Sequence, residues 1–132
     1  MKYTFVLSAI AAVCAAAIIG PDAFKTLEQI CFENGLKSEG TTLVTEDGYV
    51  LGLRRIPGKF TDDAQLQKPV VLFMHCQDCD HMEFVSNEAE KAPAIVLANL
   101  GYDVWLGNNR GNRFSLAHLD KHPSEKSFWD FY

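Results

Sequence analysis

The sequence lacks any cluster of positively charged residues. Its 132 residues hold 12 Lys and Arg against 17 Asp and Glu, a net charge of −5, and Arg54 and Arg55 are the only adjacent basic residues. Because a nucleic-acid-binding surface needs clustered basic side chains, this distribution excludes a nucleic-acid partner. Internal repeats are also absent, and the length leaves room for one domain at most.

Cysteine is scarce, with four residues in the chain. Cys14 falls in an apolar N-terminal segment, which leaves the odd set Cys31, Cys76 and Cys79. If the chain is secreted, at most one disulfide can form among these three, and their pairing stays open.

The only concentration of metal-ligating residue types is the segment 75–81, with the sequence HCQDCDH. A zinc site and a redox-active Cys-x-x-Cys pair are both alternatives here. Structural zinc usually takes its ligands from two separate segments, and a redox pair needs a thioredoxin-like setting. We therefore expect no metal, and interpret the segment as a loop that holds two thiols.

Apolar runs long enough to span a membrane are absent except at the N-terminus. Lys2 is followed by an uncharged run over residues 3–19, rich in Ala, and small residues lie near its end. This pattern predicts a secretory signal peptide over residues 1–20. The alternative is a membrane anchor, because about 18 apolar residues can span a bilayer. The Ala content favours the signal peptide.

The remaining chain alternates between helix and strand patterns. A helix is predicted over 22–34, capped by Asp22, and two strands over 41–45 and 49–56 flank a turn at 46–48. Another helix is predicted from Ala92 to residue 100, ended by Gly101.

Two apolar stretches flank this second helix. Residues 69–75 form a continuous apolar run, which is typical of a strand covered on both faces, and 103–107 predict a second buried strand. Aromatic residues after Ser124 predict the first turns of an amphipathic helix. The sequence therefore predicts a β-hairpin followed by one βαβ unit, which is part of an α/β fold.

Two segments carry a specific resemblance. Residues 45–51 (TEDGYVL) and 101–112 (GYDVWLGNNRGN), together with His75, resemble the acid lipase family, which includes gastric and lysosomal acid lipases. The resemblance implies a partial α/β-hydrolase domain over residues 21–132. It also implies hydrolysis of triacylglycerols or steryl esters, with neutral lipid esters as partners, a peripheral contact with lipid and no cofactor.

The family's reaction needs a Ser nucleophile in Gly-x-Ser-x-Gly, then an Asp and a His. None of these is in the chain. Residues 107–111 have the glycine spacing of that motif, but Asn109 at its centre has no hydroxyl, and we interpret Arg110 as a structural residue that holds the loop by hydrogen bonds.

The resemblance assigns one catalytic element to this sequence, the backbone N–H of Gln77. This N–H would form part of the oxyanion hole, and His75 would shape its loop. Cys76 replaces a family glycine and is expected to distort the loop. Phe84 and Val85 are expected to border the acyl-binding pocket.

We therefore expect an N-terminal fragment of a secreted or lysosomal acid lipase homologue that ends before the nucleophile and is inactive by itself. The alternative is a non-catalytic module that binds lipid or protein. The expected location is the secretory pathway, extracellular or lysosomal, and the sequence leaves the oligomeric state open.

Overall fold

The computed structural model describes residues 22–63 and 67–131. The signal peptide predicted for residues 1–20 lies outside these ranges. Within them, no helix has the length and apolar character needed to cross a membrane.

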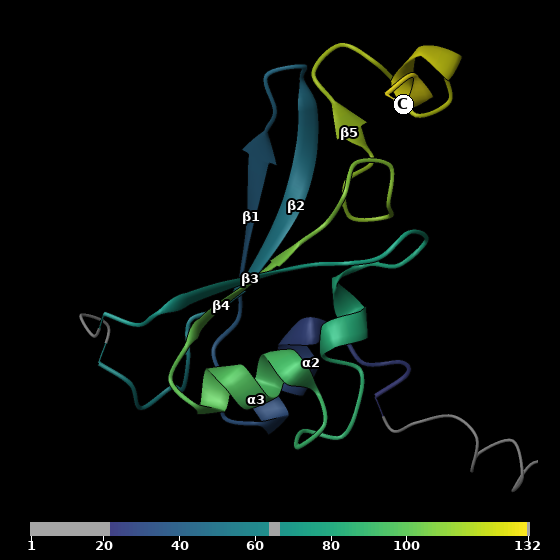
Figure 1. Ribbon diagram of the computed structural model, residues 1–132. Helices are drawn as coiled ribbons and strands as arrows, with labels where there is room; N and C mark the ends of the chain where they lie inside the picture. The colour runs from purple at the N-terminus through teal and green to yellow at the C-terminus, as the bar shows by residue number, and fades with distance from the viewer. Residues whose placement is uncertain (1–21, 64–66, 132) are drawn as a thin grey trace, which may run out of the picture.

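A mixed sheet forms the centre of the described chain (Figure 1). Its strands β1 (Glu39–Val44), β2 (Tyr49–Ile56), β3 (Val70–Met74) and β4 (Asp103–Gly107) lie in the spatial order β1-β2-β4-β3, and the short β5 (Ala117–His118) pairs with β2. β3 and β4 are parallel, whereas β2 is antiparallel to its neighbours β1 and β4. The predicted hairpin and the parallel pair of the βαβ unit are both confirmed.

The hairpin turn follows the prediction at residues 46–48. Gly48 has a φ of 90°, a left-handed value that glycine adopts without steric cost. The Thr45 side chain accepts a hydrogen bond from the Tyr49 N–H at 2.9 Å and so fixes the start of β2. β1 begins at Glu39, two residues before the predicted start.

The first helix is shorter than predicted. α2 covers Leu27–Glu33, and its N-cap is Thr26 in a capping box with Gln29. The prediction that Asp22 caps this helix was wrong, because the Thr26 hydroxyl and the Gln29 side chain bond reciprocally to the first-turn N–H groups. α3 covers Pro93–Asn99, so the predicted helix from Ala92 to residue 100 is confirmed to within one residue at each end, and Ala92 is its N-cap.

One hydrophobic core lies between the two helices and the sheet. α2, α3 and the short 3₁₀ helix η1 (His81–Phe84) lie on the same side of β3 and β4 in Figure 1. The core residues are Leu27, Ile30, Cys31, Leu36, Ile56, Val85, Ala92, Ala94, Ile95, Ala98, Val104 and Leu106. This packing positions the ends of β3 and β4 relative to each other.

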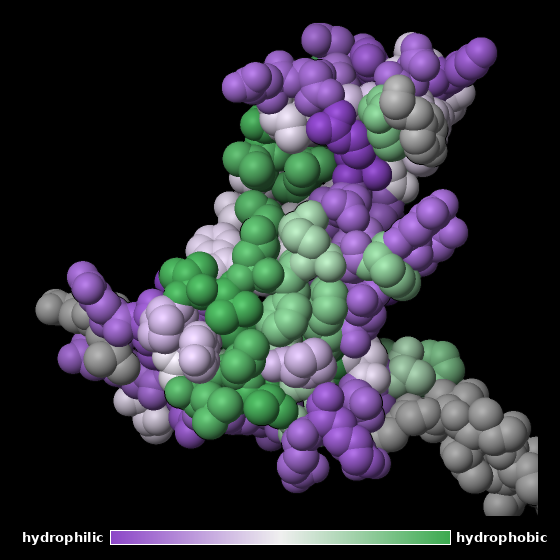
Figure 2. Space-filling view, viewed as in Figure 1, coloured by the Kyte–Doolittle hydropathy of each residue, from purple (hydrophilic) through white to green (hydrophobic). Residues whose placement is uncertain are grey.

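The other face of β3, whose apolar run is typical of a strand covered on both faces, is open within the described residues. Val70, Leu72 and Met74 are 65%, 58% and 50% exposed. Apolar side chains gather in a continuous band on the surface shown in Figure 2. The strand pattern was read correctly, but the described helices pack on one face only.

The predicted amphipathic α-helix after Ser124 was also wrong. The segment forms a 3₁₀ helix, η2 (Lys126–Trp129), instead. The Phe128 ring is fully buried against Tyr49, and the Tyr49 hydroxyl donates to the Phe128 carbonyl at 2.5 Å. This contact ties the C-terminal segment to the start of β2.

Candidate functional site

The loops that follow β3 and β4 meet at one edge of the sheet, because the two strands are parallel and end together. Met74 at the end of β3 pairs with Gly107 at the end of β4. A cavity of about 610 Å³ lies between the two loops. It is lined by His75, Cys76, Gln77, Asp78, Cys79, Asp80, Asn109, Arg110, Gly111, Asn112, Arg113, Trp129 and Phe131.

His75 is held by hydrogen bonds on both ring nitrogens. Its Nε2 accepts from the Asn109 backbone N–H at 2.9 Å and from Asn112 Nδ2 at 2.9 Å. The ring proton therefore resides on Nδ1, which donates to the Cys76 carbonyl at 2.7 Å. With its acceptor nitrogen occupied, His75 orients the loop, and it is not placed to act as a general base.

Asn108 forms the next layer of this network and is almost fully buried. Its Oδ1 accepts from the His81 N–H at 3.2 Å, from His81 Nδ1 at 3.1 Å and from Asn112 Nδ2 at 3.0 Å. Its Nδ2 donates to the Gly52 carbonyl on β2. Burial lowers the pKa of His81, since the charged ring would lose hydration.

Gln77 lies where the resemblance places the oxyanion donor. It is exposed and lines the cavity, and no group among the described residues accepts a hydrogen bond from its N–H. The backbone of Cys76 does not show the left-handed conformation that would distort the loop. Asp78 is the only described non-glycine residue with a left-handed φ, at 59°, so Cys76 needs no such conformation.

Cys76 and Cys79 form a disulfide that closes this loop. The Cys79 N–H also donates to the Cys76 carbonyl at 3.3 Å. Cys31 stays free in the core, where burial raises the pKa of its thiol to about 12. The pairing that the sequence left open is thus between the two loop cysteines.

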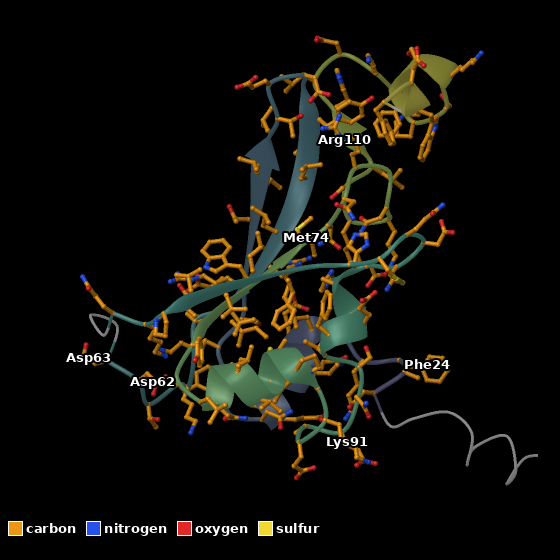
Figure 3. All side chains as sticks on the ribbon, viewed as in Figure 1. Phe24, Asp62, Asp63, Met74, Lys91 and Arg110 are labelled. Atoms are coloured by element: carbon orange, nitrogen blue, oxygen red, sulfur yellow. A yellow bond between two sulfur atoms is a disulfide. The ribbon has the colours of Figure 1, made fainter. Side chains whose placement is uncertain are left out.

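Arg110 holds the turn after β4 against the hairpin, as predicted (Figure 3). Its Nη1 donates to Asp47 at 2.5 Å, and its guanidinium lies 4.5 Å from the centre of the Tyr49 ring. The hydrogen bonds from Thr45 and then from Arg110 lower the pKa of Asp47. The two segments that carry the family resemblance therefore contact each other through these side chains.

Phe84 and Val85 do not line the cavity beside Gln77. Val85 is fully buried in the core, and the Phe84 ring is half-buried, with its centre 4.8 Å from that of Phe73. Their assignment to an acyl-binding wall stays a prediction.

The sequence analysis missed the asparagine network. Asn108 and Asn112 were seen only as parts of a family segment, and Asn109 only as a residue without a hydroxyl. A signal was present, because three amide side chains within five residues directly follow a buried strand. Their partner His75 lies 34 residues from Asn109 and 37 from Asn112, so the pairing depends on the parallel sheet.

Comparison with known proteins gives one consistent family. A model described as "Partial alpha/beta-hydrolase lipase region" matches residues 27–88. Lipase lipl-1 of Caenorhabditis elegans is 39% identical over 123 residues, covering 89% of this chain and 30% of the relative. A putative lysosomal acid lipase/cholesteryl ester hydrolase of Crotalus adamanteus is 37% identical over 114 residues, covering 86% and 28%.

Human lipase member J is 41% identical over 107 residues, covering 80% of this chain and 29% of the relative. The chain thus spans about 30% of the length of the relatives it matches. The mixed sheet, the parallel β3–β4 pair and these matches agree with one another. The chain carries a match to the partial α/β-hydrolase lipase region at residues 27–88, and over most of its length it is similar to lipases that include a lysosomal acid lipase.

Proposed function

We propose that this chain supplies the start of the sheet and the oxyanion-binding loop of a hydrolase that acts on neutral-lipid esters, triacylglycerols or steryl esters. The observation that carries the proposal is the Gln77 N–H, which has no acceptor among the described residues and lines the cavity at the edge of the sheet. Support for the substrate class comes from a relative whose name includes cholesteryl ester hydrolase.

In ester hydrolysis by a serine hydrolase, the nucleophile attacks the carbonyl carbon and negative charge develops on the carbonyl oxygen. An N–H held in place before the reaction stabilises that charge without reorganisation. His75 contributes by fixing the loop, since both of its nitrogens are bonded. Phe84 and Val85 are assigned to the acyl-binding wall, as the resemblance implies.

The 132 residues contain no Gly-x-Ser-x-Gly. We therefore expect the isolated chain to show no turnover of a nitrophenyl ester, because an oxyanion donor without a nucleophile gives at best weak residual acceleration. Serine-dependent turnover above background would refute this part of the proposal.

The donor role is tested in a chimera. Residues 22–132 replace the matching segment of a family member that carries Gly-x-Ser-x-Gly. The kcat of each variant is compared with that of the chimera without further substitutions, which is the reference. Gln77→Pro removes the N–H and is expected to lower kcat by about 100-fold or more. Gln77→Ala keeps the N–H and should stay close to the reference. Equal activity of both variants would dismiss Gln77 as the donor.

The proposed location is the secretory route, with a mature chain over residues 21–132 that is extracellular or lysosomal. Support comes from the uncharged run over residues 3–19 and from the lysosomal acid lipase named among the relatives. N-terminal sequencing of the chain recovered from a secreting host tests the location. An intact Met1 would contradict it.

The alternative function is a non-catalytic module that binds lipid or protein. The exposed apolar face of β3 favours it, because such surfaces often mark interaction sites. A cooperative thermal transition in a monomer would support this alternative. A chain that unfolds cooperatively but associates through this face would support the hydrolase proposal, in which other parts of a lipase cover this face.

A further inference from the structure

The disulfide loop and the helix after it bring three potential metal ligands together. The sulfur atoms of Cys76 and Cys79 and a carboxylate oxygen of Glu83 all lie within 4.8 Å of one another. The Cys76 sulfur lies 3.4 Å from Glu83 Oε2. Thiolate sulfur and carboxylate oxygen are both ligands of zinc in proteins.

The spacing agrees with one shared ion. Tetrahedral zinc with Zn–S near 2.3 Å and Zn–O near 2.1 Å separates a sulfur ligand from an oxygen ligand by about 3.6 Å. The Cys76 and Glu83 atoms are already 3.4 Å apart. The Cα atoms of Cys76 and Cys79 are 5.5 Å apart, so both side chains can reach one point.

The neighbouring histidines are committed elsewhere, which changes the donor set that the sequence indicated. His75 uses both ring nitrogens within the loop network, and His81 Nδ1 bonds to Asn108. The remaining set is two sulfurs from the loop and one carboxylate from η1. Three protein ligands with an open fourth position suit a zinc-type ion with a bound water. Cys76 and Cys79 line the cavity, so that position is reached from solvent.

We propose that Cys76, Cys79 and Glu83 bind one thiophilic divalent cation of the zinc class when the Cys76–Cys79 disulfide is reduced. A phosphine or a dithiol supplies the two electrons that break the S–S bond, and each sulfur gains a proton. The two thiols then release these protons as the cation binds. Re-formation of the disulfide by an oxidant with loss of the ion reverses the process. Binding of the cation does not require the ester-hydrolase function.

The experiment uses the full 132-residue chain and Cd²⁺ as the probe, because cadmium–thiolate bonds absorb in the ultraviolet. The chain is reduced with a phosphine, freed of it by gel filtration without oxygen, and titrated. We expect one equivalent of Cd²⁺ to bind with thiolate absorbance, and the oxidised chain to show none. Zn²⁺ should displace the signal competitively.

Variants separate this site from simple thiol binding. Cys79→Ala should abolish the signal, whereas Cys14→Ala and Cys31→Ala should keep it. Glu83→Gln, at an exposed position, should weaken binding by about tenfold or more, since loss of even an outer-shell partner costs that much. Its matched control is Glu90→Gln, also exposed.

Three results would overturn the proposal. They are binding by the Cys79→Ala chain, equal binding by the Glu83→Gln and Glu90→Gln chains, and equal binding by the oxidised and reduced chains.

Discussion

The strand β3 and the loop that follows it differ in how completely their side chains are partnered. Around the loop, His75 and Asn108 have hydrogen bonds on each polar side-chain atom, and no buried side-chain nitrogen or oxygen in the described residues lacks a partner. On β3, the alternate apolar side chains are 50% to 65% exposed; they are Val70, Leu72 and Met74. Hydrogen bonds among the described residues therefore fix the geometry of the site. The sheet, in contrast, is not fully buried by the described residues.

The largest effect is expected at the centre of the loop network. Asn108→Ala removes four hydrogen bonds and leaves buried donors of His81 and Asn112 without an acceptor. Because each unsatisfied buried group costs about 1–3 kcal/mol, we expect a loss of about 3 kcal/mol in the free energy of unfolding. Urea denaturation measures it, with the exposed Asn87→Ala as control. A loss below about 1 kcal/mol would show that the network does not hold the loop.

The network should also make stability depend on pH. Burial lowers the pKa of His81 in the folded chain, so the unfolded chain binds more protons below its own pKa of about 6.5. Stability is then full above pH 6.5 and falls as the pH drops from there toward the lowered folded pKa. The urea midpoint between pH 7 and pH 5 checks this. His81→Gln should flatten the profile, and the exposed His122→Gln should leave it unchanged.

A smaller effect is expected where the site loop contacts the hairpin. Arg110→Ala removes the contact of the guanidinium with the Tyr49 ring, and such cation–π contacts contribute about 1 kcal/mol. We expect a loss of about that size in urea denaturation, with Arg110→Lys recovering part of it. An unchanged midpoint for Arg110→Ala would mean that the two family segments are held together by other contacts.

The smallest effect is expected on the open face. Leu72→Ser should change the free energy of unfolding by no more than about 0.5 kcal/mol, because the side chain is 58% exposed and buries little surface. It should also lower aggregation, measured by light scattering. The adjacent Phe73→Ser is the matched control. Its ring packs on Phe84 beside the core, so it should destabilise strongly. Similar losses for both variants would remove the contrast between the two faces.

Much of the fold was predictable because local signals determine it. Patterns within a few residues predict the bounds of β2 and β4 and the hairpin turn at Gly48. They also predict the start of α3 near Ala92. The strand pattern alone does not give the exposure of Leu72, since an apolar strand does not show which neighbours cover it. The length of α2 was missed because two capping candidates compete. Only Thr26 is followed three residues later by a residue, Gln29, that completes a capping box.

The site was predictable in part. The oxyanion role of Gln77 stays a prediction from the resemblance, whereas Arg110 was interpreted correctly as a residue that holds the loop by hydrogen bonds. The hydrogen bonds to His75 Nε2 were not predicted. Their donors, Asn109 and Asn112, reach His75 only because β3 and β4 are parallel neighbours. Glu83, the third ligand of the proposed cation site, was missed for a similar reason. Its carboxylate comes close to Cys76 only because η1 folds back toward the loop.

The most direct test of the account is amide hydrogen exchange, measured residue by residue on ¹⁵N-labelled chain. The account predicts that the Gln77 N–H exchanges at close to the rate of an unstructured peptide, while the Asn109 N–H, bonded to His75, is strongly protected. A protected Gln77 N–H, or an Asn109 N–H that exchanges as fast as Gln77, would contradict a fixed loop that leaves one donor free for an incoming charge.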